Sequence, residues 1–220
     1  MRTHLMVSPL SLAAVLSVAC VAWTAPVLAA DPVTGRPVKE EANYRHTSQF
    51  MVNFGIQNGG DELIGLFDSG TGEQIDSSRA GGYARLTLGG DIALGDSDFS
   101  IEVSGGLLRD GLTSNVNEDK SVFKRKVVEL IPFWNFDRHR LGFGVAAHLE
   151  PVWSVNPDAG PSMTVDFKDT VGAVLQYDIR YDQNISVGAR YTYITYEEDV
   201  AADAAEFDGN AIGVHVTYAF

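Results

Sequence analysis

The sequence contains very little cysteine and few basic residues, and each shortage excludes a class of protein. Cys20 is the single cysteine among 220 residues, so the chain cannot form an internal disulfide and offers no cysteine-based zinc site. Only 16 lysines and arginines accompany 29 aspartates and glutamates, which gives a net charge of −13. A chain this acidic repels phosphate backbones, and we therefore predict no nucleic-acid partner. We also predict no metal site and no cofactor.

Long hydrophobic runs are missing too, with one exception near the N-terminus. An apolar stretch over residues 5–21 ends in small residues, an order that is typical of a secretory signal peptide. We predict that residues 1–30 are a leader, cleaved near Ala29 or Ala30. Two alternatives use the same segment. One is an uncleaved membrane-anchor helix. The other is lipidation at Cys20, which lacks the usual leucine or valine three positions earlier.

The rest of the chain has no helical period of useful length. Residues 31–47 are polar and interrupted by proline, and we predict a flexible lead-in there. Apolar and polar residues then alternate with period two, which is typical of β-strands with two different faces. The pattern occupies eight segments of residues 48–220, near 50–57, 84–94, 99–107, 125–136, 141–150, 171–180, 185–194 and 212–220.

Short and long connections between these segments alternate strictly. The short ones lie near 95–98, 137–140 and 182–184, and the long ones near 58–81, 109–120, 154–166 and 197–209. Such a chain places all its short turns at one end of a sheet and all its long loops at the other. We predict an all-β fold over residues 48–220: an eight-stranded antiparallel up-and-down transmembrane β-barrel. It would have three short periplasmic turns and four longer extracellular loops.

The two faces of the predicted strands differ in a way that indicates which one faces lipid. One face is apolar, whereas the other combines glycines, such as Gly89 and Gly142, with charged residues. Eight strands leave a lumen that holds side chains only, and small residues beside charged ones suit it. The apolar face then points to lipid. The alternative is a soluble, lipocalin-like barrel with an apolar cavity.

Nine charged or titratable residues have the parity of the lumen face. We predict that they plug the lumen with ion pairs and hydrogen bonds, because buried charges need partners. The alternative is a proton or ion path through a narrow pore. The nine residues are Glu102, Arg125, Glu129, His148, Glu150, Asp178, Arg180, Arg190 and His215.

The C-terminus carries the most specific pattern. The chain ends on Phe220, with Tyr218 and Val216 at alternate positions before it. This ending resembles the closing strand of bacterial outer-membrane β-barrel proteins, and residues 48–220 resemble the small eight-stranded class that includes OmpX, the OmpA barrel and OmpW. The resemblance implies a monomer in the outer membrane, in contact with lipid and lipopolysaccharide. It also implies that the barrel-assembly machinery reads Val216, Tyr218 and Phe220. Pro132 departs from the pattern, and we expect a β-bulge there.

An enzymatic role is not predicted. Barrel lipid A deacylases resemble this chain in strand plan and carry His-x-Ser on the penultimate strand, but residues 190–196 contain neither histidine nor serine. His148 and Glu150 share a parity and could act as a base with its orienting acid. No serine is placed beside them, since Ser154 and Ser162 belong to the following loop. We therefore expect a structural or surface-interaction protein.

Two charged patterns outside the lumen leave alternatives open. The first and fourth long loops are rich in carboxylates, which would suit divalent cations or would simply be solvated. Lys124 and Lys126 have the parity of the lipid face but lie beyond the apolar band. They would meet lipopolysaccharide phosphates or solvate a strand that protrudes. The loop carboxylates are Asp61, Glu62, Asp68, Glu73 and Asp76, and then Glu197, Glu198, Asp199, Asp203, Glu206 and Asp208.

Overall fold

The computed structural model describes residues 48–67, 74–113, 120–156, 161–199 and 204–220. The predicted leader and lead-in lie outside these ranges. Within them every regular element is a β-strand, and no helix is long and apolar enough to cross a membrane.

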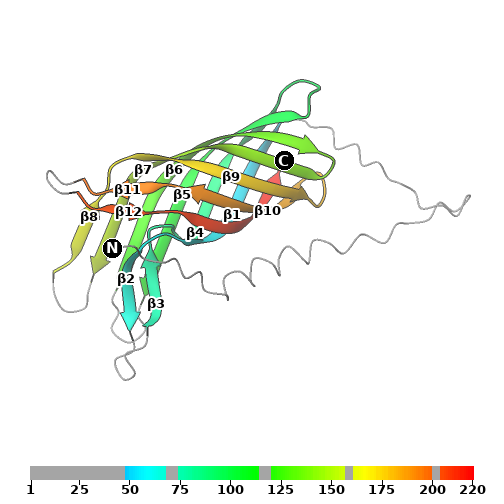
Figure 1. Ribbon diagram of the computed structural model, residues 1–220. Helices are drawn as coiled ribbons and strands as arrows, with labels where there is room; N and C mark the ends of the chain where they lie inside the picture. The colour runs from blue at the N-terminus through cyan, green and yellow to red at the C-terminus, as the bar shows by residue number, and fades with distance from the viewer. Residues whose placement is uncertain (1–47, 68–73, 114–119, 157–160, 200–203) are drawn as a thin grey trace, which may run out of the picture. The chain divides into compact units, whose positions relative to one another are not determined.

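Eight strands form a closed antiparallel barrel (Figure 1). Each strand pairs with the next one along the chain, and the last strand pairs with the first, so the ring has no free edge. Closure gives every barrel strand a hydrogen-bonded neighbour on both sides. The predicted eight-stranded antiparallel barrel is therefore confirmed. Its strands are β1 (Gln49–Gly59), β4 (Ala84–Ala93), β5 (Phe99–Thr113), β6 (Lys120–Phe136), β7 (His139–Asn156), β9 (Thr170–Arg180), β10 (Ile185–Tyr193) and β13 (Ala211–Ala219).

The two ends of the barrel differ. At one end, here called the turn end, residues 94–98, 137–138 and 181–184 join neighbouring strands. The other end, here called the loop end, carries five short strands in regions that the sequence pattern assigned to loops (Figure 1). They are β2 (Glu62–Phe67), β3 (Gln74–Arg79), β8 (Met163–Asp166), β11 (Thr195–Glu197) and β12 (Glu206–Asp208).

These short strands are held by pairing rather than by hydrophobic alternation of their own. β2 pairs with β3, β11 pairs with β12, and β8 extends the sheet beside β7. β5 and β6 also continue into the predicted loop 109–120, where Asp110 pairs with Phe123. Their polar sequences hide the strand period, so these segments resemble loops when the sequence is taken alone.

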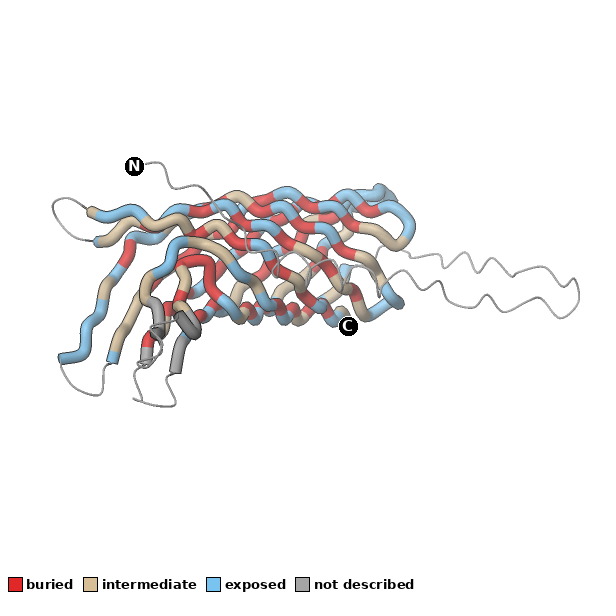
Figure 2. Tube along the Cα trace, turned by 60° about the horizontal axis from the view of Figure 1, so that its bottom comes forward, coloured by how far each residue is buried: buried red, intermediate tan, exposed pale blue. Residues whose placement is uncertain are grey.

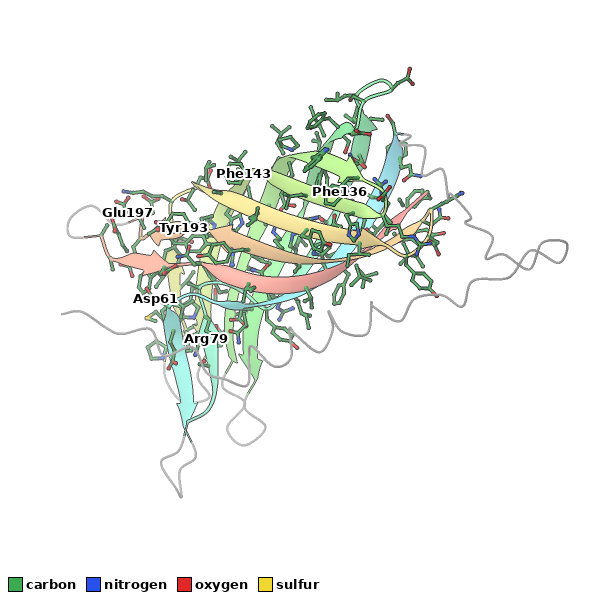
Figure 3. All side chains as sticks on the ribbon, turned by 45° about the vertical axis from the view of Figure 1, so that its right-hand side comes forward. Asp61, Arg79, Phe136, Phe143, Tyr193 and Glu197 are labelled. Atoms are coloured by element: carbon green, nitrogen blue, oxygen red, sulfur yellow. The ribbon has the colours of Figure 1, made fainter. Side chains whose placement is uncertain are left out.

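Buried and exposed residues alternate along the barrel strands (Figure 2). The exposed residues are mostly apolar and the buried ones are often charged, which is the reverse of a soluble protein. Glu129 is 1% exposed, whereas its neighbours Val128 and Leu130 are 49% and 50% exposed. Phe143 and Tyr193 likewise stand on the outer surface (Figure 3), 67% and 59% exposed. The apolar side chains therefore cover the outside of the barrel, and the charged ones fill its interior.

The bulge predicted at Pro132 is wrong. Pro132 pairs with Ile101 in the unbroken register between β5 and β6. Its pairing with β7 lapses, but Leu130 and Phe133 on either side keep one register. The backbone donor that Pro132 lacks is therefore accommodated between intact strand pairs on both sides, without a shift in register. The register shift between β6 and β7 lies instead between Lys124 and Lys126.

Candidate functional site

The centre of the lumen is built around one buried carboxylate, Glu129 on β6. The guanidinium groups of Arg85 on β4 and Arg190 on β10 both donate to it, the second with Nη2 at 2.6 Å from Oε1. Ser104 on β5 adds a hydroxyl donor at 3.1 Å. Two arginines on one carboxylate give charge-assisted hydrogen bonds, which are stronger than neutral ones. Glu129 thus ties together strands on different sides of the ring.

Neutral side chains extend this central network to further strands. Arg85 donates to the Asn53 carbonyl oxygen at 2.7 Å, and the Asn53 amide donates to the Thr217 hydroxyl at 2.7 Å. Arg190 donates to Gln176 and Thr192, each at 3.2 Å. Because buried polar groups are costly without partners, this continuity explains how charge is tolerated inside the barrel.

A second charged group lies nearer the turn end. Arg140 is 3.4 Å from Asp91, 3.5 Å from Glu102 and 3.7 Å from Asp178, and its guanidinium stacks 3.9 Å from the Phe133 ring centroid. One cation therefore faces three carboxylates from three other strands.

Asp178 has a closer partner in this group, the Nε2 atom of His215 at 2.8 Å. Gly188 makes room for the pair, because a Cβ there would lie 2.2 Å from the Asp178 carboxylate and 2.6 Å from the imidazole. The small residue beside charged ones, as predicted for the lumen face, thus has a steric function at this position.

Toward the loop end the lumen becomes aromatic. The aromatic cluster consists of Phe123, Phe167, Tyr196 and the apolar side chains packed around them. The Phe123 ring meets Phe167 and Tyr196 edge-on at 5.4 and 5.3 Å. Short strands and barrel strands both contribute to the cluster, whose other members are Ala80 and Ile194, with Leu63, Trp153, Val165 and Phe207 packed against them.

Arg125 and His148 join the aromatic cluster to the charged lumen. The Arg125 guanidinium lies 4.4 Å from the Phe123 ring centroid and 5.1 Å from that of Tyr196. Its nitrogens have no hydrogen-bond partner among the described residues, so the ring faces are its contacts. The Tyr196 hydroxyl lies 2.5 Å from His148 Nδ1, and burial raises the pKa of Tyr196 to about 12.

Seven of the nine predicted lumen residues are buried inside the barrel. Arg180 is half-buried at the turn end, where it donates to Asn135 at 2.9 Å. The seven are Glu102, Arg125, Glu129, His148, Asp178, Arg190 and His215. They lie in three groups along the barrel, and the neutral Gln176 connects the central group to the one nearer the turn end, since it accepts from Arg190 and donates to Asp178, each at 3.2 Å.

Glu150 was wrongly placed in the lumen. Its backbone has φ of 49°, at the register shift between β6 and β7, and this bulge turns the side chain outward. The carboxylate is exposed and accepts from Lys126 Nζ at 2.7 Å. The suggested base–acid pair of His148 and Glu150 is therefore not formed, since His148 contacts Tyr196 instead.

The predicted set of lumen residues leaves out four buried charged side chains on the inner face, which are Arg85, Asp91, Asp110 and Arg140. Arg140 was assigned to a turn, but β7 begins at His139 and Arg140 has the inward parity of Gly142 and Gly144. Arg85 and Asp91 are on the polar face of β4 and are buried too. Arg85 and Asp91 already lie on the polar face of the predicted strand 84–94, and extending the parity of the strands 99–107 and 141–150 by a few residues would have added Asp110 and Arg140.

The described part of the lumen has one small opening at the turn end. A pocket of about 20 Å³ opens at the turn end beside Asp91, Arg140 and Arg180, which is room for about one water molecule. No group of three acidic, histidine or cysteine side chains among the described residues is placed to hold a metal ion. Asp68, Glu73 and Asp203 of the acidic loops lie outside the described residues.

The C-terminal residues lie on the outer surface of the closing strand. Val216, Tyr218 and Phe220 are 48%, 50% and 64% exposed. Phe220 also exchanges two backbone hydrogen bonds with Phe50, at 3.2 and 2.9 Å. The last residue is thus part of the barrel seam.

Comparison with known proteins supports the fold. No protein-family model matches the sequence, and a search of curated proteins found no relative. Two crystal structures of Ail, the attachment invasion locus protein of Yersinia pestis, are similar, with TM-scores of 0.51 for Ail alone and 0.50 for its complex with the heparin analogue sucrose octasulfate. They are 14% and 15% identical to this chain, and each alignment covers 79% of this chain and 97% of Ail. At such identities the likeness is one of fold.

Proposed function

We propose that the protein is an integral β-barrel of the bacterial outer membrane, with a plugged lumen and a structural or surface-interaction role. The main observation in support of this proposal is the reversed polarity of the barrel. Exposed apolar side chains lie outside, and buried, paired charges lie inside. In water this outer surface would be a large exposed apolar patch, which is unfavourable, whereas contact with lipid favours an apolar surface.

The exposed aromatic residues support the same placement. Trp134, Phe136 and Tyr177 gather at the turn end, where His139 stacks on Phe136 and its Nδ1 lies 2.7 Å from the Tyr177 hydroxyl. Aromatic side chains with polar partners are typical of the membrane–water interface. By analogy with barrels of this kind, the turn end would be periplasmic and the loop end extracellular.

The plugged lumen rests on the paired charges and the aromatic cluster. Glu129 and its two arginines occupy the middle, and Phe123, Phe167 and Tyr196 fill the loop end. In a planar bilayer we expect no resolved conductance steps from the full chain. Stepwise conductance would favour the narrow pore that the sequence left open.

The surface-interaction role is the finer part of the proposal. Ail, whose fold is similar, is an attachment protein by name and was crystallised with a sulfated sugar. We do not expect this chain to bind a sulfated sugar, because its loop end is rich in carboxylates, including Asp61 and Glu197 (Figure 3). Polyanions would be repelled there. A catalytic role has no support, since His148 is buried against Tyr196.

One experiment tests location and leader together. Cells that produce the full chain are fractionated, and the protein is followed on gels with and without boiling. We expect it in the outer membrane, with mobility that changes on boiling and a mature N-terminus after Ala29 or Ala30. An unshifted band in the soluble periplasmic fraction would refute the proposal. The same preparation tests the expected monomer by its size in detergent.

A further inference from the structure

Three cations gather on the outer face of β5 and β6, at the loop side of the apolar surface. Arg109 and Lys124 are direct partners across the two strands, and Lys126 follows on the same face. The described residues include four exposed lysines and arginines, and Arg109, Lys124 and Lys126 are three of these four. The fourth, Lys168, is paired with Glu197. The chain as a whole has a net charge of −13, so this group of positive charges contrasts with the rest of the protein.

The arrangement is unfavourable unless an anion joins it. Like charges directly opposite on neighbouring strands destabilise a sheet, and Arg109 faces Lys124 in this way. Glu150 neutralises Lys126 only, through a contact between side chains that are 56% and 68% exposed. Such exposed pairs contribute little and rearrange readily. Within the described parts of β5, β6 and β7, Arg109 and Lys124 therefore have no contact with a carboxylate.

The residues below the cations indicate what kind of anion would fit. Pairs of outward residues run down the same two strands, from Leu107 opposite Lys126 to Phe99 opposite Trp134. The stretch 126–134 has the length of about 9–11 residues that a tilted strand needs to cross the hydrocarbon core. In a barrel that crosses the membrane with this stretch, the cations would lie where the hydrocarbon ends and headgroup phosphates begin.

We propose that Arg109, Lys124 and Lys126 bind a phosphate group of an outer-leaflet glycolipid, whose acyl chains lie against the apolar wall of β5 and β6. This inference rests on the proposed membrane location and deepens it. The guanidinium of Arg109 would donate two hydrogen bonds to the phosphate, and the two ammonium groups would add point charges. The phosphate would also relieve the repulsion between Arg109 and Lys124.

The test uses the full chain purified in a non-ionic maltoside. It is titrated with bisphosphorylated lipid A, with the same lipid after removal of both phosphates, and with inorganic phosphate, and bound lipid is counted by native mass spectrometry. We expect binding of the phosphorylated lipid only, weakened roughly fivefold by Lys124→Gln or Arg109→Gln. Lys168→Gln is the matched control, because it removes one exposed positive charge elsewhere, and it should leave binding unchanged. Lys124→Arg should retain it.

A second measurement separates binding from folding. Lys124→Gln removes a repulsion in maltoside and should leave the thermal midpoint unchanged or slightly raised, whereas in lipid A vesicles it should lower the midpoint relative to the unsubstituted chain. Equal binding by Lys124→Gln and Lys168→Gln, or binding to lipid without phosphate or to inorganic phosphate alone, would overturn the site. Flotation with vesicles is scored in the same samples. If the chain floats with vesicles but its lipid binding does not depend on the phosphates, this site alone is refuted. If the chain does not float, the membrane location and the site are both refuted.

Discussion

Two regions of the barrel interior are equally buried but are held together by different physics. In the charged middle, Glu129 joins two arginines from strands across the ring, through directional hydrogen bonds. At the loop end, Phe123 and Tyr196 pack edge to face, and Arg125 lies over both rings. The middle depends on each partner being present, because a buried charge without a partner is very costly. The aromatic cluster depends on how well its side chains fill the space, and each single van der Waals contact contributes little.

The largest expected effect comes from breaking the charged middle. Glu129→Leu leaves Arg85 and Arg190 buried without their carboxylate and should lower the free energy of unfolding by about 3–5 kcal/mol. Urea titration of the protein in detergent, followed by the gel shift on boiling, measures it. The triple variant with Arg85→Met and Arg190→Met in addition should recover much of the loss. If the single and triple variants are equally unstable, pairing is not what holds this region.

A smaller loss is expected in the aromatic cluster. Phe123→Ala removes a ring that contacts Phe167, Tyr196 and Arg125, and it should cost about 3 kcal/mol through the cavity that it leaves. The same titration measures this change. In a planar bilayer the variant should still show no conductance steps, because the charged middle stays filled. Conductance after Phe123→Ala would show that the aromatic cluster alone closes the lumen.

A steric change near the turn end should have an intermediate effect. Gly188→Ala would place a Cβ 2.2 Å from the Asp178 carboxylate and so disturb its 2.8 Å contact with His215. We expect a loss of about 2 kcal/mol in the same unfolding assay. Gly105→Ala is the control, since its nearest neighbour would be an oxygen at 3.6 Å. Similar losses for the two variants would mean that backbone flexibility, and not the buried pair, is responsible.

The smallest effect concerns the link between the two regions. Tyr196→Phe removes the hydroxyl that contacts His148 and should cost about 1 kcal/mol at neutral pH. It should also change the response to alkali. Because the pKa of Tyr196 is raised to about 12 in the folded chain, the unfolded chain loses that proton first, near pH 10, and stability falls as pH rises from 10 to 12. Urea titrations at pH 9 and pH 11 should show a steeper loss for the unsubstituted chain than for Tyr196→Phe. Parallel losses would contradict the burial of Tyr196.

The fold and most of the charged lumen were predictable because strand parity is a local property. Glu102 and Asp178 are buried as their alternation indicates, and the short connections lie near 95–98 and 182–184. Parity fails where the backbone leaves the ideal strand. Glu150 stands at a bulge with φ of 49°, and one extra residue reverses which side each later side chain faces. Pro151, which directly follows Glu150, was the available signal for that bulge, because a proline within a sheet is typically found at an edge or a bulge.

The sequence by itself determined the eight barrel strands, their order and the reversed polarity of the barrel, because a period of two depends only on neighbours in the chain. The tertiary structure decided which charges meet. Glu129 and Arg190 are 61 positions apart, and Arg140 gathers carboxylates from three other strands. It also decided that the loop regions fold into an aromatic cluster over the charged middle. Such contacts depend on strand register and on closure of the ring, which bring residues together around the barrel and not along the chain.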